Sequence, residues 1–236
     1  MTVMTIKGLE KSYRTKKALR GVDMELRAGG ITGLLGPNTS GKTTLLKTIA
    51  GLLAPDAGSI GYPGGAVRGP ASKATVSFLP DAMKFPAWMK VSDAFGFYRD
   101  MYPDYSAEKA ERMIKLLDLT PGDKVSSLSK GMQERVALAL TFSRAAPVYL
   151  LDEPLGGIDP LGKAKILEAI LSAPDDNSAI LLSTHLVKDV EAVFDSVYFI
   201  SEGKIIYGGN CDDLREKEGK TVEQKYLEVF WNVKPD

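Results

Sequence analysis

The chain has 236 residues, of which 44% are hydrophobic and 25% are charged. This is an ordinary globular composition, sufficient for one sizeable α/β domain with a core of its own. Thirty basic side chains balance thirty acidic ones, which excludes a net field that would attract nucleic acid or anionic lipid over the whole surface, although a local patch stays open. Cys211 is the only cysteine, so there is no intramolecular disulfide framework, and we expect a buried or idle thiol in a reducing compartment.

The first third of the chain is predicted to be rich in strands. Alternating apolar and polar residues indicate half-exposed strands over 3–9 and 22–27, and the apolar run 31–35 indicates a buried strand. We expect these three strands to form a lobe of mixed sheet. Residues 58–69 are rich in glycine and proline, which is typical of turns with room for one short strand, and 75–80 is a further strand that ends at a proline.

No apolar run approaches the roughly 18 residues that a membrane span needs. The N-terminus alternates like a strand and lacks the charged and then apolar layout of a signal peptide. We therefore expect a cytosolic protein, for which any role at a membrane would pass through a partner.

Helical spacing begins after residue 81. It covers 92–101 and 106–119, each of which starts at a serine that we expect to act as a cap, and it predicts a helical insert in an α/β chain. Strands then return, with helices between them, at 148–151, 179–183 and 196–200. This order is typical of a parallel sheet covered by helices.

The end of the chain is predicted to contain a hairpin and a helical tail. A turn at Glu202 and Gly203 joins strand 196–200 to a strand over 204–207. Residues 210–231 form a charged helical tail, and we expect its apolar end, Val229, Phe230 and Trp231, to dock on its own domain.

The most informative motif follows the buried strand directly: residues 36–43 have the sequence GPNTSGKT and open a helix over 44–49. In such a turn successive backbone N–H groups point at an anion, and the positive end of the helix and the Lys42 ammonium add attraction for phosphate. Thr43 supplies a hydroxyl group for a magnesium ion. The motif therefore predicts a site for a nucleoside triphosphate.

Two adjacent carboxylates, Asp152 and Glu153, end the strand at 148–151. Because neighbouring residues of a strand face opposite sides, the two acids can perform different tasks. If this strand lies beside the one that leads to the phosphate loop, Asp152 can hold magnesium through its water shell while Glu153 faces the attacking water. An acidic turn after a core strand is the alternative, which Lys42 and Thr43 upstream disfavour.

A second anion site, or only a serine cap, is indicated at residues 128–135, LSKGMQER, which begin another helix. Ser129-x-Gly131 before a helix, followed closely by LLDEP at 150–154, resembles the signature of ATP-binding cassette (ABC) proteins. The resemblance extends over essentially the whole chain, with the motifs in the order and spacing of the family.

The resemblance implies an α/β fold, the P-loop NTPase fold of ABC type, with a mostly parallel core sheet, an N-terminal antiparallel β lobe and a helical subdomain. It implies one ABC ATPase domain over 1–236, with a nucleotide-binding core at 1–80 and 146–209, a helical signature subdomain at 81–145 and a C-terminal tail at 210–236.

The resemblance also implies ATP and Mg²⁺ as ligands. Tyr13 is similar to the aromatic residue that stacks on adenine, or it covers a neighbouring strand. Asp159 is similar to the aspartate of the loop after the carboxylate strand, or it only caps the next helix. His185, the only histidine, is similar to the switch histidine that reaches the outermost phosphate.

By this resemblance the catalytic residues are Lys42, Glu153 and His185, and the magnesium ligands are Thr43, Asp152 and Asp81. The nucleotide contacts are Tyr13, Gly36, Asn38, Thr39, Ser40, Gly41, Lys42, Thr43, Thr44, Ser129, Gly131 and Asp159.

Three residues depart from the family pattern. Thr39 stands where glycine is usual, which reduces the tolerance of the loop for unusual dihedral angles. Met132 stands where the signature often has glutamine, as in relatives that resemble bacterial drug and peptide exporters. Asp81 replaces an expected glutamine, so that a shorter and negatively charged side chain would lie near phosphate, and the coupling of this chain can differ.

The function that the resemblance implies is ATP-driven export through a separate integral-membrane permease, at the cytoplasmic face of the membrane, with no nucleic-acid partner. The nucleotide site of one chain would be incomplete by itself, because Ser129 and Gly131 complete the site of an opposite subunit, identical or related, in a head-to-tail dimer. Contact with the permease is expected near residues 81–101, with Phe85, Pro86 and Trp88 as candidates unless they only fill the helical lobe.

Two alternatives stay open at this point. A soluble cassette protein acting on ribosomes or DNA usually carries two cassettes, long insertions or basic extensions, and none is visible here. A regulatory cassette that binds ATP without hydrolysing it is motivated by Asp81 and Thr39. A phosphotransferase is disfavoured, because a small kinase has no obvious use for the helix site at Ser129.

Overall fold

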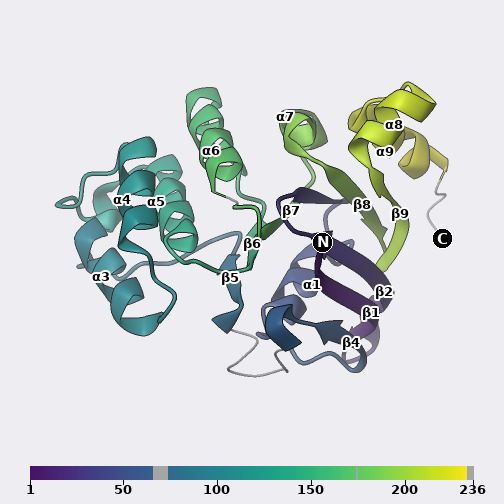
Figure 1. Ribbon diagram of the computed structural model, residues 1–236, viewed down its shortest axis with the longest axis horizontal. Helices are drawn as coiled ribbons and strands as arrows, with labels where there is room; N and C mark the ends of the chain where they lie inside the picture. The colour runs from purple at the N-terminus through teal and green to yellow at the C-terminus, as the bar shows by residue number, and fades with distance from the viewer. Residues whose placement is uncertain (66–73, 174, 233–236) are drawn as a thin grey trace.

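The computed structural model describes residues 1–65, 74–173 and 175–232, which form two sheets with helices around them (Figure 1). The first sheet is antiparallel, with strand order β2-β1-β4, and consists of β1 (Thr2–Tyr13), β2 (Lys16–Arg27) and β4 (Ala57–Gly61). The strands expected at 3–9 and 22–27 lie inside β1 and β2, and β4 is the short strand of the turn-rich region. Residues 66–69 of that region lie outside the described residues.

The second sheet has the strand order β5-β6-β7-β3-β8-β9, in which only β9 runs antiparallel to its neighbour. The strands are β3 (Ile31–Leu35), β5 (Val76–Leu79), β6 (Val148–Asp152), β7 (Ala179–Thr184), β8 (Ser196–Ser201) and β9 (Lys204–Asn210). The predicted strands and the β8–β9 hairpin are confirmed. The prediction of a mixed first lobe is wrong, because β3 is buried along its whole length and pairs with β7 and β8.

Strand β7 lies between β3 and β6, so the carboxylate strand is not beside the strand that leads into the phosphate loop. The magnesium role predicted for Asp152 depended on the carboxylate strand lying beside the strand that leads to the phosphate loop, and this condition is wrong. Leu35 nevertheless pairs with Thr184, and Asp152 with Ser183, so the carboxyl ends of all three strands reach one edge of the sheet. The groups predicted to act together meet at this edge across β7.

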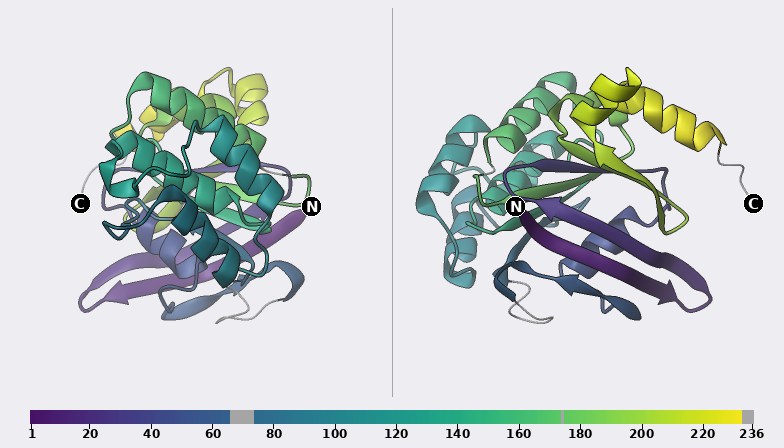
Figure 2. Two further views of the ribbon diagram at one scale, coloured as in Figure 1. Left: turned by 90° about the vertical axis from the view of Figure 1, so that its left-hand side faces the viewer. Right: turned by 45° about the vertical axis from the view of Figure 1, so that its right-hand side comes forward.

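Helices cover both faces of this sheet, and α3 (Val91–Met101), α4 (Ala107–Leu116) and α5 (Lys130–Phe142) gather at one end of the molecule (Figures 1 and 2). Helix α1 (Lys42–Ile49) follows the phosphate loop, and α3, α4 and α5 form the helical end. The remaining helices are α6 (Pro160–Ser172), α7 (Val187–Val190), α8 (Cys211–Glu218) and α9 (Val222–Asn232), with 3₁₀ turns at η1 (Pro63–Gly65), η2 (Val125–Ser127) and η3 (Glu191–Val193).

The two expected serine caps have different outcomes. Ser106 caps α4, since its hydroxyl accepts the backbone N–H of Lys109 at 3.2 Å. The expectation for Ser92 is wrong, because α3 begins one residue earlier and its cap position is Lys90. The Asp93 carboxylate accepts the Lys90 backbone N–H at 2.9 Å and so supplies the polar contact at this helix start.

Buried side chains form one core on each face of the parallel sheet. Along β6, Tyr149 and Leu151 enter the core under the helical end, while Val148 and Leu150 enter the core shared with α1 and the antiparallel sheet. This alternation is what a strand covered on both sides requires, because successive side chains point to opposite faces. The division of the chain at residues 80, 145 and 209 stays a proposal.

The tail forms two helices, α8 and α9, separated by Gly219 in a left-handed conformation (φ 62°). Val229 and Phe230 pack on the core as expected, whereas Trp231 is 89% exposed, so the expectation of docking is wrong for that residue.

Cys211 is fully buried, which confirms the expected buried thiol. Within the described ranges, no helix combines the length and apolar character that a bilayer crossing requires.

Candidate functional site

The turn between β3 and α1 depends on two glycines. A Cβ atom on Gly36 would lie 2.3 Å from the carbonyl oxygen of Ile200, which is a steric overlap. Gly41, the residue before α1, has a φ of 113°, and a Cβ there would lie 2.8 Å from the carbonyl oxygen of Ala18. The turn is therefore packed between β2 and β8 as only glycine allows, and it presents the N-terminus of α1, with its unpaired N–H groups, to the adjacent cleft.

Thr39 occupies a left-handed conformation in the same turn, with a φ of 68°. This is the position where the resemblance leads one to expect glycine. A β-branched residue is strained there, because its Cβ substituents crowd the backbone. Thr39 therefore holds conformational strain at this position of the turn.

The Lys42 ammonium group is buried at the centre of the turn, with 6% of the residue exposed. Its Nζ donates to the carbonyl oxygens of Gly36 at 2.8 Å and Pro37 at 3.2 Å, and lies 3.4 Å from Oε1 of Glu153. A phosphate bound in the turn would exchange some of these contacts for its own oxygens, and the lysine would remain partnered throughout.

Glu153 connects the phosphate loop to the loop after β7. Its Oε2 lies 2.9 Å from Nδ1 of His185 and accepts the His185 backbone N–H at 3.3 Å. The backbone of Glu153 is itself held by Ser183, whose carbonyl oxygen accepts its N–H at 3.0 Å. A carboxylate fixed between a lysine and an imidazole can orient a water molecule and accept its proton.

Asp152 is almost fully buried, with 1% of the residue exposed. Its Oδ1 accepts the Ser183 hydroxyl at 2.6 Å, whereas the buried Oδ2 has no hydrogen bond of normal geometry within the described residues. Burial raises the pKa of this carboxyl; Ser183 and the Thr43 side chain act against the rise, and the Asp81 and Glu153 carboxylates add to it. The arrangement leaves an acceptor atom available next to Thr43.

These groups fit a magnesium ion. Magnesium usually takes one or two carboxylates and completes its octahedron with water and phosphate oxygens. Asp152 offers an unpartnered oxygen and Thr43 is beside it, and no three His, Cys, Asp or Glu side chains in the described part of the chain converge as a complete metal cage. Asp81 lines the cleft that opens over the phosphate loop, as expected.

A cleft of about 580 Å³ opens over the turn. Tyr13, 46% exposed at the end of β1, lies in its wall, together with the predicted Asn38, Thr39, Gly41, Lys42, Thr43, Thr44, Asp81 and Glu153. The cleft is also lined by three cations of β2, Lys16, Lys17 and Arg20, which were not predicted from the sequence. Their clustering directly after Tyr13 was the available signal. They add positive charge to the cleft wall, which suits a polyphosphate, although Arg20 lies 3.8 Å from Glu202 of the same lining.

Ser129, Gly131 and Asp159 do not line this cleft. Ser129 caps α5, where its hydroxyl accepts the Met132 N–H at 3.3 Å. Asp159 caps α6 by accepting the Gly162 N–H at 3.0 Å, which lowers the pKa of its carboxyl. A Cβ on Gly131 would lie 4.0 Å from the Asp159 carboxylate, so the two motifs lie against each other.

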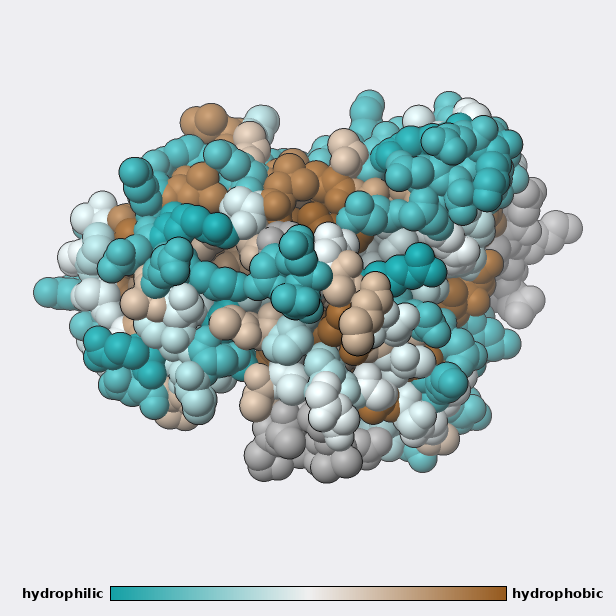
Figure 3. Space-filling view, in the orientation of Figure 1, coloured by the Kyte–Doolittle hydropathy of each residue, from teal (hydrophilic) through white to brown (hydrophobic). Residues whose placement is uncertain are grey.

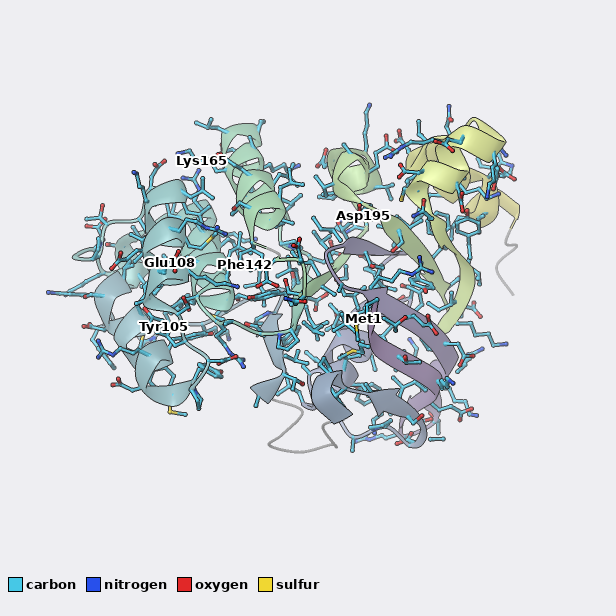
Figure 4. The ribbon with its side chains drawn as sticks, in the orientation of Figure 1. Met1, Tyr105, Glu108, Phe142, Lys165 and Asp195 are labelled. Atoms are coloured by element: carbon cyan, nitrogen blue, oxygen red, sulfur yellow. The ribbon has the colours of Figure 1, made fainter. Side chains whose placement is uncertain are left out.

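In Figure 4, Tyr105 and Glu108 lie at the helical end of the molecule, and Met1 and Asp195 lie on the other side. The structure therefore brings the phosphate loop, the carboxylates and His185 together but leaves the signature residues apart from them.

The three residues expected to contact the permease differ in their exposure to solvent. Phe85 is partly buried against the core, whereas Pro86 is exposed and Trp88 is 66% exposed. The face of the molecule in Figure 3 is largely hydrophilic, with an apolar strip between α6 and α7.

The carboxyl edge of the parallel sheet carries a buried strand, a glycine turn, a helix that begins with lysine and a second strand that ends in carboxylates. This combination defines a P-loop nucleoside triphosphatase. Comparison with known proteins narrows this class. The family model described as "ABC transporter" matches residues 19–156. The chain belongs to this family, and it is an ATP-binding cassette that hydrolyses ATP.

Two relatives and one solved structure illustrate the match. The daunorubicin resistance ATP-binding protein DrrA3 of Streptomyces coeruleorubidus is 30% identical over 225 residues, which cover 92% of this chain and 71% of that protein. The ABC transporter ATP-binding protein YdbJ of Bacillus subtilis (strain 168) is 31% identical over 232 residues, covering 96% and 74%. A structure described as the ATP-binding subunit of an ABC transporter has a TM-score of 0.86 at 26% identity, covering 97% of this chain and 99% of that one. The expected family and fold class are confirmed.

Proposed function

We propose that two such cassettes close head-to-tail over two MgATP molecules and thereby drive export through a separate integral-membrane permease. The observation that carries this proposal is that Ser129 and Gly131 do not line the cleft that contains Lys42 and Glu153. A second anion site at the start of α5 has no phosphate to bind within its own chain. A facing subunit, identical or related, would place one there.

In this arrangement the turn holds the phosphates, through Lys42 and the residues Gly36, Asn38, Thr39, Ser40, Gly41, Thr43 and Thr44. Tyr13 stacks on adenine. Glu153 orients the attacking water and accepts its proton, and His185 stabilises the charge that develops on the outermost phosphate. Magnesium, when bound, neutralises phosphate charge, and Thr43, Asp152 and Asp81 would hold it. Ser129, Gly131 and Asp159 act on the site of the partner. Hydrolysis removes the contact that joins the two subunits.

We further propose that the permease binds the helical end, which places the cassette at the cytoplasmic face of the membrane. Trp88 is exposed beside α3, and Phe97 and Met101, one turn apart on that helix, are 53% and 60% exposed. Phe97 and Met101 are neighbours on one face of α3, and adjacent exposed apolar side chains are typical of an interaction surface. The zero net charge argues against a nucleic-acid partner. The resistance function of the relative DrrA3 supports export as the direction.

The shared-site model can be tested by mixing two inactive variants. Lys42→Ala disables the phosphate loop of its own chain, and Ser129→Arg disables the signature that the chain offers to its partner. In a mixed pair one site combines the intact Lys42 of one chain with the intact Ser129 of the other, so we expect the mixture to regain ATPase activity that neither variant has alone.

Two further measurements complete this test. Light scattering of Glu153→Gln under saturating MgATP should report a two-cassette mass, and purification from membranes should retain a permease rather than ribosomes or DNA. A mass of one chain, alone and with every related cassette offered, would overturn the proposal.

A further inference from the structure

The C-terminal helix α9 lies beside both loops that carry the proposed phosphate-binding groups, and it lines a cleft with each of them. Tyr226 and Leu227 of α9 line a cleft of about 260 Å³ together with His185 and Leu186. Phe230 lines a second cleft of about 290 Å³, whose other wall is the phosphate loop, Pro37, Asn38, Thr39 and Ser40. Tyr226 and Phe230 are one helical turn apart, with ring centroids separated by 4.3 Å, so one face of α9 reaches both loops.

This face is anchored to the strand beside the phosphate loop. The ring of Phe199, fully buried in β8, lies 5.5 Å from the ring of Tyr226 in an edge-on contact and 6.3 Å from that of Phe230. Phe199 pairs across the sheet with Leu35, the residue immediately before Gly36. The aromatic cluster therefore rests on the base of the phosphate loop, and its geometry favours an ordered packing.

The other anchor lies on the segment that follows His185. Glu191, just after α7, accepts the backbone N–H of Glu223 in the first turn of α9 at 2.9 Å. A carboxylate at this position satisfies an N–H group that the helix leaves unpaired. The pKa of Tyr226 is raised, chiefly by burial and also by the Glu153 carboxylate, so the phenol is within electrostatic reach of the proposed base.

We infer that α9 holds the loop of His185 and Leu186, the histidine loop, in place, and that Tyr226 is a positioning residue for His185. This inference rests on the proposed function, in which the imidazole acts on the outermost phosphate. The ring of Tyr226, held on Phe199, limits where the histidine loop can lie, so His185 is aligned before the reaction begins. The loss of this support therefore lowers kcat, while ATP binding, which depends on the other loop, is preserved.

The test uses the full chain. Tyr226→Ala is expected to lower kcat about tenfold, since misplacing a reacting group by a fraction of its contact distance has effects of this order, and to leave the Kd for ATP within about twofold. Tyr226→Phe keeps the ring and should restore most of the activity. Trp231→Ala, a loss of an exposed aromatic side chain from the same helix, is the matched control and should behave like the parent protein. Thermal unfolding of each variant reports folding, and Tyr226→Leu replaces Tyr226→Ala if the latter does not fold.

A double-mutant cycle with His185→Ala separates this inference from the proposed function. If Tyr226 acts through His185, Tyr226→Ala should cost little more in a chain that already lacks the imidazole. Equal losses in both backgrounds, or no kcat loss from Tyr226→Ala alone, overturn the inference. An unchanged kcat in His185→Ala itself would instead overturn the role that the proposed function gives to the histidine.

Discussion

Glu153 and His185 are bound to each other twice, because one carboxylate oxygen contacts both Nδ1 of the ring, at 2.9 Å, and the backbone N–H, at 3.3 Å. The other oxygen faces Lys42 at 3.4 Å. The carboxylate therefore links the loop after β7 to the phosphate loop, and nucleotide entry has to be accommodated by all three residues together.

Glu153→Gln is expected to bind ATP and to hydrolyse it at least about 100-fold more slowly, because an amide cannot accept the proton of the attacking water. Phosphate release and equilibrium ATP binding, measured on the same preparation, test this expectation. Glu202→Gln, which changes another acid lining the cleft, is the control and should retain turnover. Full phosphate release by Glu153→Gln would remove the residue from its proposed role.

Thr39→Gly should stabilise the protein. The threonine is held at a φ of 68°, which costs about 1 to 3 kcal/mol for a residue with a Cβ, and part of the gain is offset by the greater freedom of glycine in the unfolded chain. We expect a net gain of about 1 kcal/mol, or about 2 to 4 °C in Tm. Thr39→Ala keeps a Cβ at the same φ and should not show the gain. A lower Tm for the glycine variant would contradict the strain argument.

Arg144 links the helical end to β5. The residue is 4% exposed, its Nε and Nη2 donate to the Asp104 carboxylate at 3.0 and 2.9 Å, and its Nη1 donates to the carbonyl oxygen of Val76 at 2.8 Å. The guanidinium also lies over the ring of Tyr102, with Cζ 4.1 Å from the centroid. The planar group thus satisfies the buried carbonyl of Val76 and the half-buried Asp104 carboxylate at once.

Arg144→Met should lower the free energy of unfolding by about 3 kcal/mol, because it leaves the Asp104 carboxylate and the strand carbonyl without their donor. Urea unfolding measures this loss. Arg99→Met removes an arginine from the exposed pair with Asp100 and should change stability by no more than about 0.5 kcal/mol. Equal effects of the two substitutions would show that burial of the pair is irrelevant.

Cys211 predicts a loss of stability at alkaline pH. Burial raises the pKa of its thiol from 9.0 to about 11. The unfolded chain therefore loses this proton at lower pH than the folded chain, so the stabilisation is complete below pH 9 and is lost as pH rises towards 11, by at most about 2 to 3 kcal/mol. Cys211→Ala should show a correspondingly flatter decline in urea unfolding experiments across this interval. Parallel curves for the two proteins would contradict the assignment.

Prediction succeeded where the determining interactions are local in sequence. The turn at residues 36–43 and the strand ends at 148–153 were recognisable because backbone geometry and glycine placement act within a few residues. The cap of α3 was missed because two polar residues compete at that helix start, and Asp93 rather than Ser92 makes the contact. The exposure of Trp231 was missed because an apolar residue near a chain end carries no signal of which side it faces.

The amino-acid sequence by itself determined the family, the phosphate loop and the acids that accompany it, since each of these is a short run whose chemistry follows from its own residues. Tertiary structure alone decided that β7 separates β3 from β6, that Lys16, Lys17 and Arg20 face the nucleotide cleft, and that α9 lies across two loops. These relationships join residues far apart in the chain, and they depend on which surfaces are buried together when the sheet and its helices pack.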